Sequence, residues 1–384
     1  MQSHLNVKYG TPRARVLAAM NGEMVSPVPF DIFLNYIYPD LASELYRSFN
    51  LAETDTEGLL RALDAHLRCG KPLYNGPPLE ELPHIPPAAP ATMVFRGIWG
   101  TLEGIETWSE VFEHPLQYAE TTADIHAHPW PDPDWMDYTR LGWFSDTPAN
   151  YLPVAQWADK YRNFARWVTD WQPLFSRLMD LFGMQAGLMN MAQRPDLIEA
   201  ATAHIADYLE EYYQRLAASV QGQADILGFG DDFAGQQGLI MSPRMWRRYF
   251  LPVWKRLFPI AHQYGMKASL HSCGAVRAVL GDLIDAGLDM LEVTQVTAEG
   301  MDAAAIKNDF GSHLTFYGGL DIQSILNLGT PEQVRTEVRR LIDILGKDGR
   351  YILTSCHFLL DDIPAENVLA MHAEARSHVP IWAT

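Results

Sequence analysis

The stretch Lys267-Ala-Ser-Leu-His271 is a short, largely apolar run that leads into a polar turn, Ser272-Cys-Gly274. The same arrangement recurs towards the C-terminus. Further short strands are predicted at 290–293, 315–317 and 351–354, with helices at 275–286, 301–309, 331–345 and 364–376. Short apolar strands that alternate with helices predict a parallel sheet whose faces are covered by helices.

Upstream of this stretch the pattern continues and then becomes harder to bound. We expect a strand at 225–229 and helices at 159–171, 173–182, 194–220 and 243–264, and, in the irregular first half, a strand at 27–33 and helices at 12–20, 40–49 and 56–67. No GxGxxG or GxxxxGK[ST] motif follows a predicted strand, which argues against a doubly wound nucleotide-binding sheet. We therefore predict a (β/α)8 TIM barrel. It forms a single domain over 1–384, with an N-terminal helical extension at 1–26 and loop-rich insertions at 71–153.

Composition limits the partners and the compartment. The chain has 384 residues and a formal net charge of -18, which disfavours binding to nucleic acid or to an anionic membrane surface. It carries three cysteines, too few for a disulfide framework, and shows neither a transmembrane run nor a signal-peptide core. We expect a cytoplasmic protein, which could form a homodimer.

Reactive side chains gather where the predicted strands end. In a (β/α)8 barrel these ends form the active face. His271 and Cys273 are two residues apart, so in extended backbone both side chains point to one side. Cys356, after the last strand, could supply a third ligand, and a His-Cys-Cys set suits a catalytic zinc ion with one open position. The competing interpretation is that these are buried structural residues.

Several motifs in this region resemble those of the uroporphyrinogen decarboxylase superfamily. They are His271-Ser-Cys-Gly-Ala-Val276, Leu283-Ile-Asp-Ala-Gly-Leu-Asp289, Gly318-Gly-Leu-Asp321, Gly329-Thr-Pro-Glu-Gln-Val334 and Pro364-Ala-Glu-Asn367. More narrowly, the chain is similar to the zinc-dependent, cobalamin-linked methyltransferase branch. The resemblance implies a barrel fold and a zinc ion held by His271, Cys273 and Cys356. Because no Asp-x-His-x-x-Gly corrinoid signature is present, it also implies that the cobalamin arrives on a separate corrinoid protein.

The reaction suggested by this resemblance is methyl transfer between a small methylated substrate and the cobalt of that corrinoid protein. The aromatic first half of the chain favours a methoxylated aromatic substrate, and hence O-demethylation. The alternative is transfer from methylcobalamin to a thiol. Decarboxylation of a porphyrinogen is a third interpretation, disfavoured because the segment after the first strand, Phe30-Asp-Ile-Phe-Leu-Asn-Tyr-Ile-Tyr38, carries no arginine for substrate carboxylates.

Other polar residues near the strand ends complete the predicted site. We expect Glu292, Asp232 and Gln295 to be catalytic, with Glu292 a candidate general acid. Asp231, Asn35, Tyr36 and His357 are expected to bind the substrate. For Asp231 and Asp232 a purely structural role, such as capping a neighbouring segment, is an equal alternative.

Overall fold

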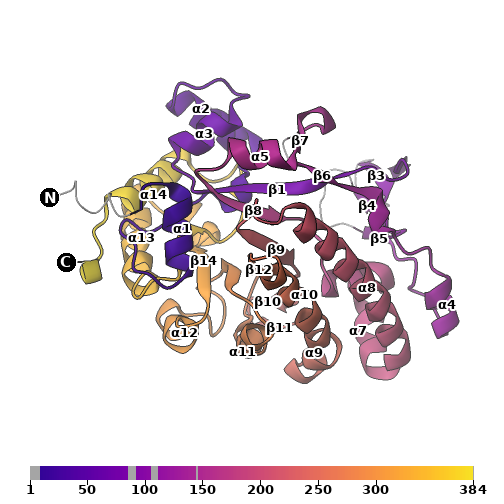
Figure 1. Ribbon diagram of the computed structural model, residues 1–384. Helices are drawn as coiled ribbons and strands as arrows, with labels where there is room; N and C mark the ends of the chain where they lie inside the picture. The colour runs from indigo at the N-terminus through magenta and orange to yellow at the C-terminus, as the bar shows by residue number, and fades with distance from the viewer. Residues whose placement is uncertain (1–8, 85–91, 105–110, 144–145, 384) are drawn as a thin grey trace.

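The computed structural model describes residues 9–84, 92–104, 111–143 and 146–383. Its centre is a curved sheet of parallel strands (Figure 1). In sheet order these are β15 (Tyr351–Ser355), β14 (Thr315–Leu320), β13 (Met290–Thr294), β12 (Lys267–His271), β9 (Ile226–Gly230), β8 (Ala165–Thr169) and β1 (Leu67–Tyr74). The strands predicted in the second half of the chain are therefore all present.

A short extended segment around Phe30 closes the sheet into a barrel. Phe30 forms a parallel bridge with Leu353 of β15. On its other side, the Phe30 carbonyl accepts the His66 amide at 3.0 Å, next to the start of β1. Eight parallel segments thus complete the ring, and the predicted (β/α)8 fold is confirmed. The predicted strand at 27–33 is shorter than expected, because a 3₁₀ turn, η2 (Phe33–Asn35), follows it.

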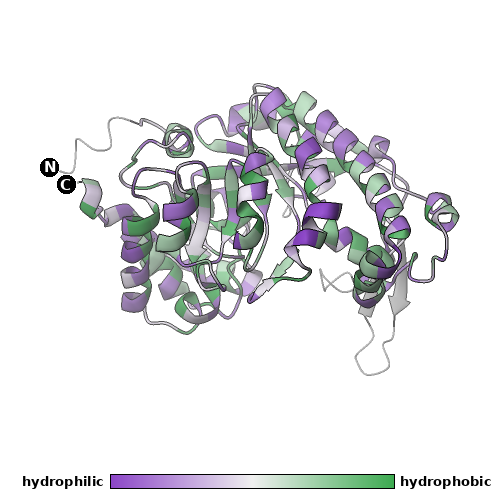
Figure 2. Cartoon of the chain, turned by 90° about the horizontal axis from the view of Figure 1, so that it is seen from below, coloured by the Kyte–Doolittle hydropathy of each residue, from purple (hydrophilic) through white to green (hydrophobic). Residues whose placement is uncertain are grey.

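Helices surround the strands and are banded with hydrophobic and hydrophilic residues (Figure 2). They are α1 (Pro12–Met20), α2 (Pro39–Ser48), α3 (Thr56–Ala62), α4 (Thr122–Ala127), α5 (Val154–Lys160), α6 (Phe175–Phe182), α7 (Met184–Gln193), α8 (Pro195–Ser219), α9 (Pro243–Tyr249), α10 (Leu251–Gln263), α11 (Arg277–Asp285), α12 (Ala303–Phe310), α13 (Pro331–Leu345) and α14 (Ala365–Ser377). Local signals fix several starts: Thr330 forms a capping box ahead of Pro331, for example. Within the described parts of the chain, no helix has the length and hydropathy needed to cross a bilayer.

Large side chains fill the inside of the barrel. Trp167 of β8 and Tyr317 of β14 are fully buried and meet edge to face, with ring centroids 5.3 Å apart. Val16 and Met20 of α1 belong to the same buried cluster. Helix α1 therefore closes the end of the barrel at which the strands begin and leaves the opposite end, where they finish, for function.

The segment between β1 and β8 extends the barrel on one side (Figure 1). Strand β6 (Met136–Gly142) pairs antiparallel with β1, and β7 (Leu152–Pro153) pairs with β6. A separate antiparallel sheet contains β2 (Glu80–His84), β3 (Thr92–Arg96), β4 (Leu102–Gly104) and β5 (Val111–Glu113). These strands lie within the stretch that the sequence marked as insertions.

Two predicted helices were wrong in their second halves. The helix expected at 56–67 ends at Ala62, and the one expected at 159–171 is replaced by the end of α5 and by strand β8. Phe164, Trp167 and Trp171 have helical spacing, but they face three different environments. Phe164 packs under the guanidinium of Arg68, Trp167 lies inside the barrel, and Trp171 is 42% exposed. Pairing with β1 and β9 overrides the local pattern. Cys69 lies on β1, and His66 just before that strand is buried.

Asp31 is a fully buried carboxylate inside the closing segment. It accepts hydrogen bonds from the Leu67 amide at 3.1 Å and the Tyr317 hydroxyl at 2.8 Å. Burial nevertheless raises the pKa of Asp31 to about 7, since these hydrogen bonds compensate only in part. The folded protein therefore keeps a proton on Asp31 at a pH where the unfolded chain has released it.

The replacement Asp31→Asn is expected to reduce the pH dependence of stability. In the wild type, the contribution of Asp31 to the free energy of unfolding falls as the pH rises from about 4 to about 7, since the folded state binds the extra proton. Between about pH 5 and about pH 7.5 this amounts to about 2–3 kcal/mol, which the variant should lose. Urea unfolding at both pH values measures it, and equal slopes for the two proteins would contradict the assignment.

Candidate metal centre

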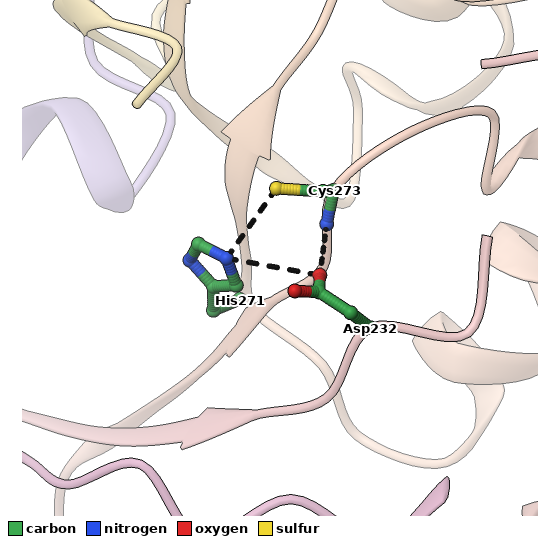
Figure 3. A group of neighbouring side chains, drawn as sticks. All are labelled: Asp232, His271 and Cys273. Carbon is green, nitrogen blue, oxygen red and sulfur yellow. Dashed lines mark hydrogen bonds and ion pairs between the residues drawn. The ribbon is translucent and has the colours of Figure 1, made fainter. Parts of the chain in front are cut away.

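Three potential metal ligands meet where β9 and β12 end (Figure 3). His271 is the last residue of β12 and pairs in register with Gly230, the last residue of β9. Cys273 and Asp232 each lie two residues beyond these positions, and their side chains converge on His271. The ligand atoms of Asp232, His271 and Cys273 all lie within 4.8 Å of one another. We call these three residues the metal cluster.

The distances within the metal cluster fit a tetrahedral zinc ion. His271 Nε2 is 3.6 Å from Cys273 Sγ and 3.8 Å from an Asp232 carboxylate oxygen. Zinc bonds of about 2.0–2.3 Å at tetrahedral angles place neighbouring ligand atoms about 3.4–3.8 Å apart. The Cys273 amide also donates to Asp232 at 2.8 Å, which ties the two loops together. The nitrogen, sulfur and oxygen atoms of the metal cluster therefore have a spacing that is compatible with one tetrahedral metal ion.

Glu292 supports the cluster from the next strand. It pairs in register with His271, and its carboxylate lies 3.2 Å from His271 Nδ1. Burial alone would lower the pKa of His271, but Cys273, Glu292 and Asp232 together raise it well above its usual value. Burial raises the pKa of Glu292, with His271 opposing. A carboxylate that accepts Nδ1–H fixes the tautomer whose Nε2 is free to bind a metal.

Cys356, the third predicted ligand, follows β15 and is not part of the metal cluster. Its side chain is buried, and burial raises its pKa to about 12, an effect that the charge of nearby Cys273 increases. The structure thus brings together His271 and Cys273, adds Asp232, and leaves metal binding by Cys356 a prediction.

Three of the other predicted residues hold the backbone in place. Asp231 is fully buried and accepts the amides of Phe175 and Ser176 at 2.8 and 3.0 Å, so it caps α6. Gln295 accepts the Gly274 amide and shapes the loop after Cys273. The side-chain oxygen of Asn35 accepts a hydrogen bond of 3.0 Å from the Cys69 amide. A direct role for any of them in substrate binding or catalysis stays a prediction.

Aromatic side chains surround the metal cluster. Phe33 lies 5.9 Å from the His271 ring and stacks on His357 at 5.7 Å, measured between ring centroids. Phe358 packs edge-on against Phe33 and against Tyr36. Trp171, just after β8, stands 5.5 Å from the His271 ring on another side. We call Phe33, Tyr36, Trp171, His357 and Phe358 the aromatic wall.

The sequence had placed Tyr36 and His357 near the substrate but missed Trp171 and Phe358. Trp171 would have been recognised had β8 been predicted, since it lies two residues beyond the end of that strand. Burial, together with the nearby His271, lowers the pKa of His357 to about 4, so this side chain is neutral at pH 7.

The fold and the metal cluster define a (β/α)8 barrel with a metal-binding arrangement at the ends of its strands. Residues 174–378 match the uroporphyrinogen decarboxylase (URO-D) family. This match covers more than half of the chain, which therefore belongs to that family.

Similar proteins lie in the methyltransferase branch. The chain is 24% identical over 194 residues to the methylcobamide:CoM methyltransferase MtaA of Methanosarcina barkeri, covering 50% of this chain and 53% of that protein. It is 27% identical over 182 residues to a methylated-thiol–coenzyme M methyltransferase of Methanosarcina mazei, covering 45% and 46%. The chain thus spans about half the length of the curated relatives that it matches.

A solved methyltransferase from Methanosarcina mazei shares the fold over almost the whole chain. Its TM-score is 0.59 at 18% identity, and the match covers 95% of this chain and 98% of that one. Together with the sequence matches, it confirms the resemblance that the motifs around His271 indicated.

Proposed function

We propose that this protein is a zinc-dependent methyltransferase that moves a methyl group between the cobalt of a corrinoid protein and a small substrate held at the metal cluster. The observation that carries the proposal is the convergence of Asp232, His271 and Cys273 at the ends of the barrel strands. The names of the similar proteins, methylcobamide:CoM and methylated-thiol–coenzyme M methyltransferase, support the reaction class.

The roles of this chain's own residues follow from their contacts. His271, Cys273 and Asp232 would hold the zinc ion, with Cys356 a further predicted ligand. Zinc, when bound, acts as a Lewis acid that keeps a coordinated thiol deprotonated at neutral pH. Glu292 keeps His271 in the tautomer that can bind the ion. The hydrogen bond from the Cys273 amide to Asp232 holds the two ligand-bearing loops at a constant spacing.

The direction of transfer has two candidates. The relatives favour methylation of a thiol by methylcobalamin, in which the thiolate sulfur takes the methyl group and cobalt keeps the bonding electron pair as cob(I)alamin. The aromatic wall favours a second candidate, O-demethylation of a methoxylated aromatic compound, because flat rings stack on aromatic side chains.

Methyl transfer is expected to require both zinc and a corrinoid. Purified zinc-loaded protein with methylcobalamin and a thiol should form cob(I)alamin and a thioether. With cob(I)alamin and a methoxylated aromatic compound, it should form methylcobalamin if the second candidate holds. The cobalamin absorption bands follow both reactions, and omission of the corrinoid is the control. Product formation without any corrinoid would contradict the proposed function.

A further inference from the structure

The charged residues in seven of the loops around the metal centre are all acidic. Seven loops follow the ends of barrel segments at 32–38, 170–174, 231–242, 272–276, 295–302, 321–330 and 356–364, and all are described. None of them contains a lysine or an arginine. Apart from the fully buried Asp231, they carry these acidic residues: Asp170, Asp232, Glu299, Asp302, Asp321, Asp361 and Asp362. The rim around the metal cluster is therefore acidic in its fixed charges.

Most of the cations next to these loops have acidic or backbone partners: Arg277, which follows the loop at 272–276, pairs with Asp309, whereas Arg244 in the first turn of α9 is exposed. Lys71 of β1 lies 3.6 Å from Asp170, and this carboxylate raises the pKa of the lysine. In the segment between β1 and β8, Arg96 binds Glu113 and Arg140 binds the Tyr151 carbonyl. The charges of Lys71 and Arg96 are thus already balanced by carboxylates, and the guanidinium of Arg140 is held at the Tyr151 carbonyl.

Solvent reaches the metal cluster past acidic and aromatic side chains. The Asp232 side chain is 39% exposed, Trp171 is 42% exposed, and Cys273 is partly exposed. When a thiol occupies the metal, an anionic group at the other end of the ligand would lose hydration next to carboxylates and aromatic rings, which is costly. A neutral ligand meets no such penalty, and a cation is attracted both by carboxylates and by the faces of aromatic rings.

We propose that the small substrate of the metal centre is uncharged or positively charged, and that the site discriminates against thiols bearing a sulfonate or carboxylate. This inference rests on the proposed function and narrows it. It also predicts that this protein prefers a substrate other than coenzyme M, the compound in the names of its relatives, because coenzyme M is a sulfonate.

A series of thiols that differ only in charge tests the proposal. The probes are 2-mercaptoethanol, cysteamine and coenzyme M, in which a two-carbon thiol ends in a hydroxyl, an ammonium or a sulfonate group. Binding to cobalt(II)-substituted protein is followed by the sulfur-to-cobalt charge-transfer band, with each dissociation constant corrected for the thiolate fraction of the probe. We expect coenzyme M to bind at least about tenfold more weakly than 2-mercaptoethanol, and cysteamine at least as tightly as 2-mercaptoethanol. The difference in affinity between coenzyme M and 2-mercaptoethanol should become smaller as salt is added, because salt screens the carboxylates.

Two variants with the same charge reversal, one on the rim and one far from it, test whether the rim causes the preference. Glu299 is exposed in the loop after β13, and its amide donates to Gln236, which in turn bonds Gln295 beside Cys273. Glu299→Lys should reduce the ratio of the dissociation constants of coenzyme M and 2-mercaptoethanol about threefold or more. Asp285→Lys makes the same charge change at the last residue of α11, at the end of the barrel where the strands begin, and should leave the ratio of the two dissociation constants unchanged.

The outcomes separate this inference from the proposed function. Coenzyme M binding as tightly as 2-mercaptoethanol, or no thiol binding at all, overturns the charge proposal. The expected binding order combined with no methyl transfer to or from a corrinoid overturns the proposed function and leaves the charge preference standing. If methyl transfer occurs and coenzyme M is as good an acceptor as 2-mercaptoethanol, the charge proposal is overturned and the proposed function stands.

Discussion

Cys273→Ala is expected to lose bound zinc and methyl transfer together while the barrel stays folded. In the proposed function Cys273 would supply the sulfur ligand of the zinc ion, and its Sγ lies 3.6 Å from the Nε2 atom of His271. Lewis-acid stabilisation by a metal ion contributes several kcal/mol, so activity should fall by about 10²–10⁴-fold. The fold should survive, because the hydrophobic core of a chain this long does not depend on the ion.

Elemental analysis, circular dichroism and the cobalamin assay measure the three effects. Cys69→Ala is the matched control, since Cys69 is a buried cysteine on β1 outside the metal cluster. It should keep both zinc and activity. Full zinc content in Cys273→Ala would rule out the metal centre, whereas an unfolded variant would make the zinc structural.

The same measurement on two further variants identifies the remaining ligand. Loss of a residue that only hydrogen-bonds to a metal ligand typically weakens metal binding by about 10–100-fold. Asp232→Asn should weaken zinc binding by more than this, because Asp232 contributes an oxygen to the cluster. A comparable loss in Cys356→Ala would give the ion four protein ligands and close the open position. Unchanged zinc affinity in Cys356→Ala would instead contradict the ligand set predicted from the sequence.

Glu292→Gln is expected to lower zinc affinity by about 10–100-fold, with methyl transfer restored by excess zinc. The Glu292 carboxylate is 1% exposed and lies 3.2 Å from His271 Nδ1, so its neutral replacement weakens control of the histidine tautomer. The structure therefore favours a positioning role over the general-acid role considered from the sequence.

The general-acid hypothesis makes a different prediction for the same variant. It requires unchanged zinc affinity and a loss of about 10²–10⁴-fold in turnover that added zinc does not restore. Glu53→Gln, the same substitution at an exposed position outside the metal cluster and its rim, is the control and should leave both quantities unchanged. Metal titration followed by single-turnover assays distinguishes the two roles.

Local sequence patterns were sufficient wherever an element's own residues determine it. Strand β12 and helix α13 have the predicted bounds, Lys267–His271 and Pro331–Leu345, because an apolar run and a capping box with an N-terminal proline are local signals. The prediction failed at β1 and β8, which are held by pairing with neighbours distant in the sequence. A short strand with aromatic residues at helical spacing cannot be distinguished from a helix without those neighbours.

By itself, the sequence determined the barrel, the family and the His271–Cys273 pair, because these depend on local periodicity and on motifs contiguous in the chain. Only the tertiary structure decided that Asp232 joins the pair, that Glu292 contacts His271 Nδ1, and that Trp171 stands beside the metal cluster. These contacts depend on the lateral register of parallel strands and on the paths of the loops beyond them. Both are set by packing between segments far apart in the chain, which no local pattern of residues encodes.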